Sequence, residues 1–168
     1  MKATIEQLKD LLDERIVVLD GSYGVLIQRN VKGEEAYRGE RFRDHSHDVA
    51  GDPDLLNLTQ PEVVRDIHRS YLAAGADVVT TNTFTATSIV QHDPSLQEYA
   101  YEMNVEGTRL AREAADELDR PTWVAGSVGP LNVSLSLSPK VADPTYRRAT
   151  FDEVRDAYAE QIRGLLEG

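Results

Sequence analysis

Short apolar runs alternate with longer amphipathic segments along this chain, and this alternation constrains the fold more than any other feature. The runs cover residues 16–19, 77–81 and 123–125, and polar or glycine residues bound each of them. Each run is too short for a helix. Near-continuous apolar runs separated by amphipathic helices are typical of a parallel sheet covered by helices. The sequence therefore predicts an α/β protein made of strand–helix units.

Four segments open with a Ser or Thr that is followed three residues later by Glu or Gln. In this capping box the hydroxyl accepts a hydrogen bond from a backbone N–H at the helix start, and the later side chain reaches back to the cap. Apolar residues at helical spacing follow each box, so the boxes predict four helices. They are Thr4 with Gln7, Thr59 with Glu62, Ser95 with Glu98, and Thr150 with Glu153.

The segments that follow the first and third runs are long. Residues 21–60 and 126–149 are predicted to be loops, and long loops inside a compact domain are usually functional. The order of elements fits two architectures, an open doubly wound sheet or part of a (β/α)8 barrel. A complete barrel usually needs ~250 residues, so 168 residues cannot hold eight units with loops of this length.

Composition narrows the range of functions. The 29 acidic and 18 basic side chains give a formal net charge of −11, which repels phosphate backbones and anionic lipids. We therefore expect neither nucleic acid nor a membrane as a partner. No secretion signal and no run of about 18 apolar residues is found, so we expect a cytoplasmic location. The absence of cysteine excludes disulfides, a thiolate metal site and a cysteine nucleophile.

Polar residues and glycines follow each of the three predicted strands. Asp20 and Gly21 end the first strand, and their carboxylate and turn N–H groups could bind the amine and the carboxylate of a small ligand. Asn82 and Thr83 follow the second strand, and Ser127 lies in the turn after the third. At the ends of parallel strands these residues would line one site. Each motif is also compatible with an ordinary turn or a polar strand end.

The histidines do not predict a metal site. His45 and His47 form an H-x-H pair in a charged segment without a third convergent ligand, so a solvated loop is the favoured interpretation. His68 is predicted to be a surface or partly packed residue of a helix. Residues 37–42 combine two aromatic side chains with alternating charge and are predicted to form a surface loop.

Taken together, these motifs resemble the N-terminal homocysteine-binding module of the methionine synthase family. The resemblance extends from Val17 onward. Its most specific part is Arg38-Gly39-Glu40-Arg41-Phe42, which favours the cobalamin-dependent enzymes over relatives that use betaine or S-methylmethionine. The other matching stretches are residues 19–21, 54–56, 61–63, 74–77, 81–84, 129–130, 136–139, 143–144 and 150–152.

The resemblance implies a (β/α)8 barrel whose mouth binds homocysteine and Zn²⁺. In the family, cysteines from later strands hold the zinc, which deprotonates the substrate thiol. The thiolate takes a methyl group from methylcobalamin on a separate module, and a folate-binding module recharges the cobalamin with 5-methyltetrahydrofolate. Asp20 and Gly21 would bind the amino-acid end of homocysteine, and Asn82, Thr83 and Ser127 would line the same mouth.

The chain also departs from the family pattern. Val25 stands where threonine is common, and Thr80 stands where an acidic residue is common. The zinc-binding cysteines and the fourth strand are absent as well. We therefore expect residues 1–168 to form one partial domain, the N-terminal half of the barrel, truncated before the fourth strand.

These departures lead us to expect a homocysteine-binding fragment that is inactive alone and holds neither zinc nor cobalamin. Its partners would be the remaining barrel half and the cobalamin and folate modules of the complete enzyme. Its exposed sheet edge would favour self-association. The alternative is a non-catalytic α/β module that binds a small amino acid through Asp20 and Gly21.

Overall fold

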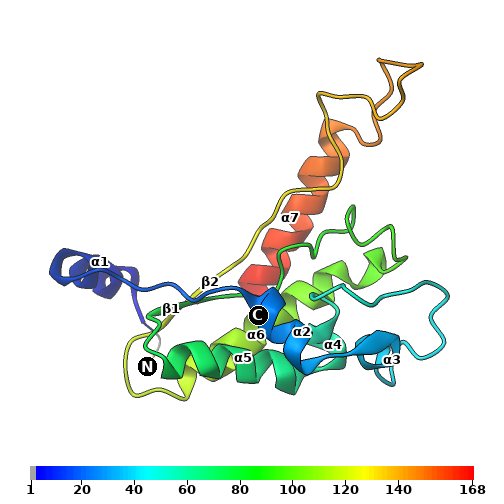
Figure 1. The fold of residues 1–168 in the computed structure, drawn as a ribbon. Helices are drawn as coiled ribbons and strands as arrows, with labels where there is room; N and C mark the ends of the chain where they lie inside the picture. Colours follow the sequence, from blue (N-terminus) through cyan, green and yellow to red (C-terminus); the bar gives the residue numbers. More distant parts are fainter. Residues whose placement is uncertain (1–2) are drawn as a thin grey trace.

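The computed structural model describes residues 3–168 and contains a small parallel sheet (Figure 1). Strand β1 (Val78–Thr80) pairs with strand β2 (Trp123–Ala125), with Val79 opposite Val124. The two strands coincide with the second and third apolar runs. Their parallel direction and the helices around them confirm the predicted α/β class.

The first apolar run lies beside β1 without forming a full strand. Leu19 makes a single parallel bridge to Val78, and the Asp20 N–H donates to the Val78 carbonyl at 3.0 Å. The Val18 carbonyl accepts from the N–H groups of Asp77 and Val78 at 2.8 and 3.2 Å. The three runs therefore lie in chain order, with β1 in the middle.

Three long helices follow the predicted apolar stripes. Helices α5 (Pro61–Ala73) and α6 (Ala100–Asp116) pack side by side, and α7 (Phe151–Glu167) packs on α6 and projects away from the sheet (Figure 1). None of the helices within residues 3–168 is both long and apolar enough to cross a membrane. An apolar cluster joins α5 and α6 to β1 and consists of Leu72, Val79, Ala111, Ala114 and Ala115.

The segment predicted to be one long loop, residues 21–60, contains three helices. They are α2 (Tyr23–Asn30), α3 (Gly33–Arg38) and α4 (Leu56–Thr59). The prediction was wrong because these short helices carry no capping box and depend on a shared core for their stability. That core includes Ile27, Val31, Tyr37, Phe42, Leu55, Leu56, Val64 and Ile67. Residues 126–149 contain no helix or strand, as predicted, and extend beyond the start of α7 (Figure 1).

The predicted surface loop at residues 37–42 is anchored in the same core. Tyr37 is 7% exposed and Phe42 is 4% exposed, so the prediction was wrong for both aromatic residues. The Phe42 ring packs edge-to-face on Tyr99, with 4.9 Å between the ring centroids. The aromatic side chains therefore face the core, and the charged side chains between them remain at the surface.

Two of the four predicted capping boxes are present. Thr4 caps α1 (Ile5–Glu14), and Thr150 caps α7. The boxes at Thr59 and Ser95 were wrong. Helix α5 begins at Pro61, so Thr59 stays in α4, where its hydroxyl donates to the Leu55 carbonyl. Ser95 has a φ of 59°, and a short 3-10 helix, η1 (Gln97–Tyr99), begins after Leu96.

Asp77 fixes the first run against β1. Its side chain is 3% exposed, and its carboxylate accepts from the Arg15 guanidinium at 2.6 and 2.8 Å and from the Val18 N–H at 2.9 Å. The hydrogen bonds from Arg15 lower the pKa of Asp77 from 3.8 to about 2. Ionised Asp77 therefore contributes to the stability of the fold.

Asp77→Asn is expected to lower the free energy of unfolding by roughly 1–2 kcal/mol at pH 7, because the pair with half-exposed Arg15 is lost. Since the pKa of Asp77 is lower in the folded state, its stabilisation is fully present above about pH 4 and is lost as the pH falls toward about 2. Urea unfolding of both proteins at pH 7 and about pH 3 measures the difference. A difference that does not shrink at the lower pH would contradict this account.

Candidate functional site

Polar groups from all three runs meet at the carboxyl edge of the sheet. The Asp20 carboxylate accepts from the Thr80 N–H at 2.7 Å and from the Thr80 hydroxyl at 3.0 Å. On the other side of β1, the Ser127 N–H donates to the Thr81 hydroxyl at 2.8 Å, and the Thr83 hydroxyl donates to the Ser127 carbonyl at 2.9 Å. Asp20, Thr83 and Ser127 therefore lie along one edge, where the sites of parallel α/β proteins are found.

Asp20 places a partly exposed carboxylate at this edge. Its Oδ2 accepts from the Thr80 N–H and, at 3.0 Å, from the Tyr23 hydroxyl. Its Oδ1 accepts a hydrogen bond from the Thr80 hydroxyl. Because an ionised carboxylate offers about four acceptor positions, Oδ1 keeps the capacity to bind a ligand cation.

The turn after Asp20 is exposed at Gly21 and Ser22. A Cβ on Gly21 would lie 3.0 Å from the Tyr71 hydroxyl oxygen, and that hydroxyl donates to the Ser22 carbonyl at 2.9 Å. Ser22 is the N-cap of α2, but its side chain makes no capping hydrogen bond. The first N–H groups of α2 therefore favour an anionic group beside Asp20.

Asn82 and Thr83 lie deeper than the other predicted site residues, since they are 5% and 0% exposed. The Asn82 amide donates to the Pro53 carbonyl at 2.7 Å and to Asn57 Oδ1 at 3.1 Å. The Thr83 hydroxyl donates a hydrogen bond to the backbone carbonyl of Ser127. These two side chains hold the turn after β1, and their contact with a substrate stays a prediction.

His68 is a neighbour of the site that the sequence analysis missed. The prediction of a surface or partly packed residue was wrong, because the side chain is 0% exposed. Its Nδ1 lies 2.5 Å from the Tyr23 hydroxyl, which also contacts Asp20. Burial disfavours the imidazolium form and lowers the pKa of His68 to about 4. Val64 and Leu72 lie four residues before and after His68 on the buried face of α5. This spacing of apolar residues could have indicated that His68 is buried.

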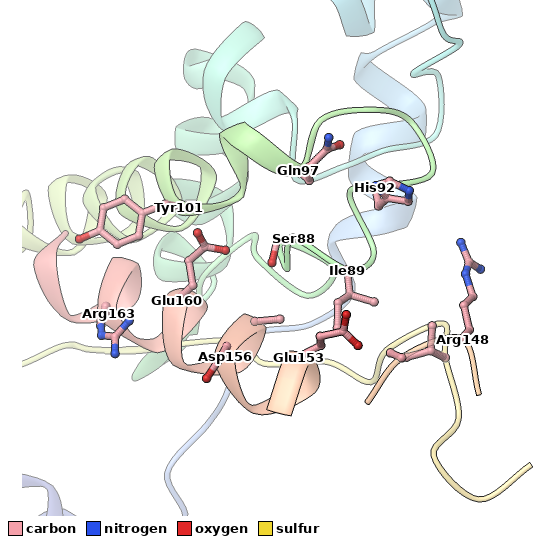
Figure 2. A pocket seen from close by; sticks show the side chains of 13 residues that line it. Ser88, Ile89, His92, Gln97, Tyr101, Arg148, Glu153, Asp156, Glu160 and Arg163 are labelled. Carbon is pink, nitrogen blue, oxygen red and sulfur yellow. The ribbon is translucent and has the colours of Figure 1, made fainter. Parts of the chain in front are cut away.

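A cavity of about 660 Å³ lies away from this edge, between α7 and residues 88–101 (Figure 2). Three acidic side chains of α7 line this cavity. Their spacing along the helix is the sequence feature that could have indicated a shared acidic face. None of the predicted site residues lines it, so we place the candidate site at the strand edge. The charged residues around the cavity are Arg148, Glu153, Asp156, Glu160 and Arg163.

The parallel strands and the helices around them define an α/β protein, and its candidate site lies at the carboxyl edge of the strands. Residues 17–168 match the family described as homocysteine S-methyltransferase. The chain therefore belongs to the homocysteine S-methyltransferase family. This match confirms the family resemblance seen in the sequence.

Two solved structures are similar in fold. Both are of the homocysteine methyltransferase MmuM from Escherichia coli, in a metallated and an oxidized form, and each has a TM-score of 0.66 and 22% sequence identity. The similarity covers 95% of this chain and 53% or 52% of the MmuM chains. This chain thus spans about half the length of those proteins, and the likeness describes the fold alone.

The zinc that the family implies does not fit the residues of this chain. A thiolate zinc site needs cysteines, and the sequence has none. Among residues 3–168, no three His, Asp or Glu side chains are grouped so that they could hold a metal ion. In the H-x-H pair, His45 Nε2 instead contacts the Pro94 carbonyl at 2.6 Å.

Proposed function

We propose that this chain forms the homocysteine-binding part of a homocysteine S-methyltransferase, within the cobalamin-dependent methionine synthase branch. Membership of the family supports homocysteine as the substrate, and the Arg38-Gly39-Glu40-Arg41-Phe42 motif supports the branch. In the complete reaction the homocysteine sulfur loses its proton and gains a methyl group, and methionine is formed. Methylcobalamin, recharged by 5-methyltetrahydrofolate, would supply that methyl group.

The Asp20 carboxylate is the observation that carries this proposal. The ligand ammonium would bind at Oδ1 of Asp20, and the ligand carboxylate would face the uncapped N–H groups at the start of α2. Asp20 is held in place from β1 by Thr80 and from α2 by Tyr23. The chain thus orients the amino-acid end of homocysteine and leaves its thiol free to react.

We further propose that these strand–helix units are the first part of a (β/α)8 barrel, and that the remaining part completes the site. The chain order of the three parallel runs supports this, and so does a similarity that covers about half of each MmuM chain. Ile162 and Leu166 of α7 are 47% and 82% exposed beside Val124 of β2, and the remaining part would cover them. Alone, the chain should self-associate through this face and lack methyl transfer.

A titration of the chain with L-homocysteine, followed by nuclear magnetic resonance, tests the proposal. We expect a Kd of roughly millimolar order, because one end of the ligand is held. Asp20→Asn should weaken binding by about tenfold or more, because a charge-assisted hydrogen bond to the ammonium is lost. Asp10→Asn removes an exposed carboxylate from α1 and should leave the affinity unchanged.

The same titration distinguishes the proposal from a non-catalytic amino-acid-binding module. Because the chain alone holds only the amino-acid end, the titration is repeated with the remaining barrel half added. The affinity for homocysteine should then rise above the affinities for alanine and serine, and equal affinities under that condition would favour the module. Binding of homocysteine that Asp20→Asn leaves unchanged would exclude both functions at this edge.

A further inference from the structure

Tyr23 lies between the proposed ligand-binding carboxylate and a buried histidine. Its hydroxyl is 3.0 Å from Asp20 Oδ2 and 2.5 Å from His68 Nδ1. The Tyr23 and His68 rings pack edge-to-face, with 5.1 Å between their centroids. These contacts connect α5 through α2 to the end of the first run.

The number of protons links the directions of these two hydrogen bonds. An ionised carboxylate only accepts, and a tyrosine hydroxyl has one proton to donate. If that proton is donated to Asp20, the Tyr23 oxygen must accept from His68, so Nδ1 carries the imidazole proton. His68 Nε2 is buried without a hydrogen-bond partner, which suits an unprotonated nitrogen better than an N–H group.

Burial keeps both rings in the protonation states that this arrangement needs. Desolvation and the nearby Asp20 carboxylate raise the pKa of Tyr23 far above its ordinary value, so the hydroxyl keeps its proton. The low pKa of His68 keeps the imidazole neutral at physiological pH.

We propose that Tyr23 and His68 are positioning residues that fix the Asp20 carboxylate for the ammonium group of homocysteine, an inference that rests on the proposed function. His68 donates to Tyr23, and Tyr23 donates to Oδ2 of Asp20. Together with the Thr80 N–H, this occupies Oδ2, whereas Oδ1 accepts only from the Thr80 hydroxyl and keeps an acceptor position for the ligand. His68 acts through Tyr23 and does not touch the substrate.

The tautomer of His68 can be measured on the ligand-free wild-type chain by long-range proton–nitrogen NMR correlation. We expect a neutral imidazole with its proton on Nδ1, unchanged between about pH 6 and 8. A proton on Nε2 would overturn the inference, because Tyr23 would then donate to His68 and not to Asp20.

The role in ligand binding is tested with homocysteine and with 4-mercaptobutyrate, which lacks the amino group. Tyr23→Phe should weaken homocysteine binding about tenfold and leave binding of 4-mercaptobutyrate unchanged. An equal loss for both ligands would indicate a general structural effect and overturn the inference. A purely structural role for Tyr23 would not produce dependence on the ligand amine.

Two substitutions of His68 provide a matched comparison. The side-chain nitrogen of Asn can occupy the position of Nδ1, whereas Gln extends to the position of Nε2. His68→Asn should therefore keep most of the preference for homocysteine over 4-mercaptobutyrate, and His68→Gln should lose it. The reverse order would contradict the proposed hydrogen bond.

The outcomes also separate this inference from the proposed function. If the wild-type chain does not prefer homocysteine to 4-mercaptobutyrate, amine recognition at Asp20 is wrong and the inference falls with it. If the preference exists and Tyr23→Phe retains it, the proposed function stands and the role of Tyr23 and His68 is overturned.

Discussion

Gly107→Ala is expected to lower the free energy of unfolding by about 2 kcal/mol, because α6 approaches the turn after β1 too closely for a side chain. A Cβ at position 107 would lie 2.6 Å from Asn57 Nδ2 and 2.7 Å from Thr83 Cγ2. Both neighbours are buried, at 2% and 0% exposure. Overpacking of a core typically costs ~1–3 kcal/mol, and the better helix propensity of alanine offsets up to ~1 kcal/mol of that.

Neither neighbour of Gly107 can move without losing hydrogen bonds. The Asn57 amide donates to the carbonyls of Asn82 and Met103 at 2.7 and 3.0 Å. The Thr83 hydroxyl donates to the Ser127 carbonyl, and the Thr83 carbonyl accepts from Gln161 at 2.8 Å. Gly107→Ala should therefore also disturb the strand edge at which we propose that the ligand binds.

Urea unfolding at pH 7 measures this effect, and Gly24→Ala is the matched control. Gly24 also lies in a helix, but a Cβ there would meet only the Ser22 hydroxyl oxygen, at 4.0 Å. Gly24→Ala should be neutral or stabilising by up to ~1 kcal/mol. If both substitutions changed stability equally, the close approach at Gly107 would not be the cause.

The parallel strands and the long helices could be predicted because their signals are local. The runs around Val79 and Val124 are continuous apolar segments, and Thr150 with Glu153 forms the predicted cap of α7. These features depend on neighbours within a few residues of the chain. The fold class therefore followed from the sequence alone.

The helices between residues 23 and 59 could not be predicted, because they depend on contacts between distant segments. Leu55 and Leu56 are fully buried in a core that also contains Leu110 of α6. A local signal can also mislead: Thr59 matches a capping box, yet proline fits the first position of a helix, and α5 begins at Pro61. Tertiary packing decided the first outcome, and the local preference of Pro61 for a helix start decided the second.

The candidate site, like the fold, could be predicted from the sequence only in part. Asp20 and Gly21 end a recognisable apolar run, so the strand edge was predictable. His68 is 45 residues from Tyr23 in the sequence, and only the packing of α5 on α2 brings them together. The contacts of Tyr23 and His68 with the proposed ligand-binding group could therefore not be predicted from sequence patterns.

Asp54→Asn is expected to stabilise the protein at pH 8 by on the order of a few kcal/mol, because it removes a carboxylate from the core. Asp54 is 0% exposed, and burial, with a further contribution from the nearby Asp52 charge, raises its pKa from 3.8 to about 7. Its Oδ2 accepts from the Thr85 N–H at 2.7 Å, while its Oδ1 is buried without a partner. The amide oxygen of Asn can still accept from Thr85.

The sign of the pH dependence follows from proton binding. Below about pH 4 the Asp54 carboxyl is protonated in both the folded and the unfolded state, so its burial costs no ionisation energy. Between about pH 4 and pH 7 only the folded state holds the proton, so the free energy of unfolding falls as the pH rises. Above about pH 7 the full cost is present.

Urea unfolding of the wild type and Asp54→Asn at pH 5, 6, 7 and about 8 measures this window. The stability of the wild type relative to Asp54→Asn should fall steadily from pH 5 to pH 7 and level off by about pH 8. Asp48 is the matched control, since its side chain is 97% exposed in the same segment, and Asp48→Asn should differ from the wild type by the same small amount at every pH. The free energies of unfolding of the wild type and Asp54→Asn could instead differ by the same amount at pH 5 and pH 8. Asp54 would then stay ionised in the core, and a cation or water bound at Oδ1 would stabilise it.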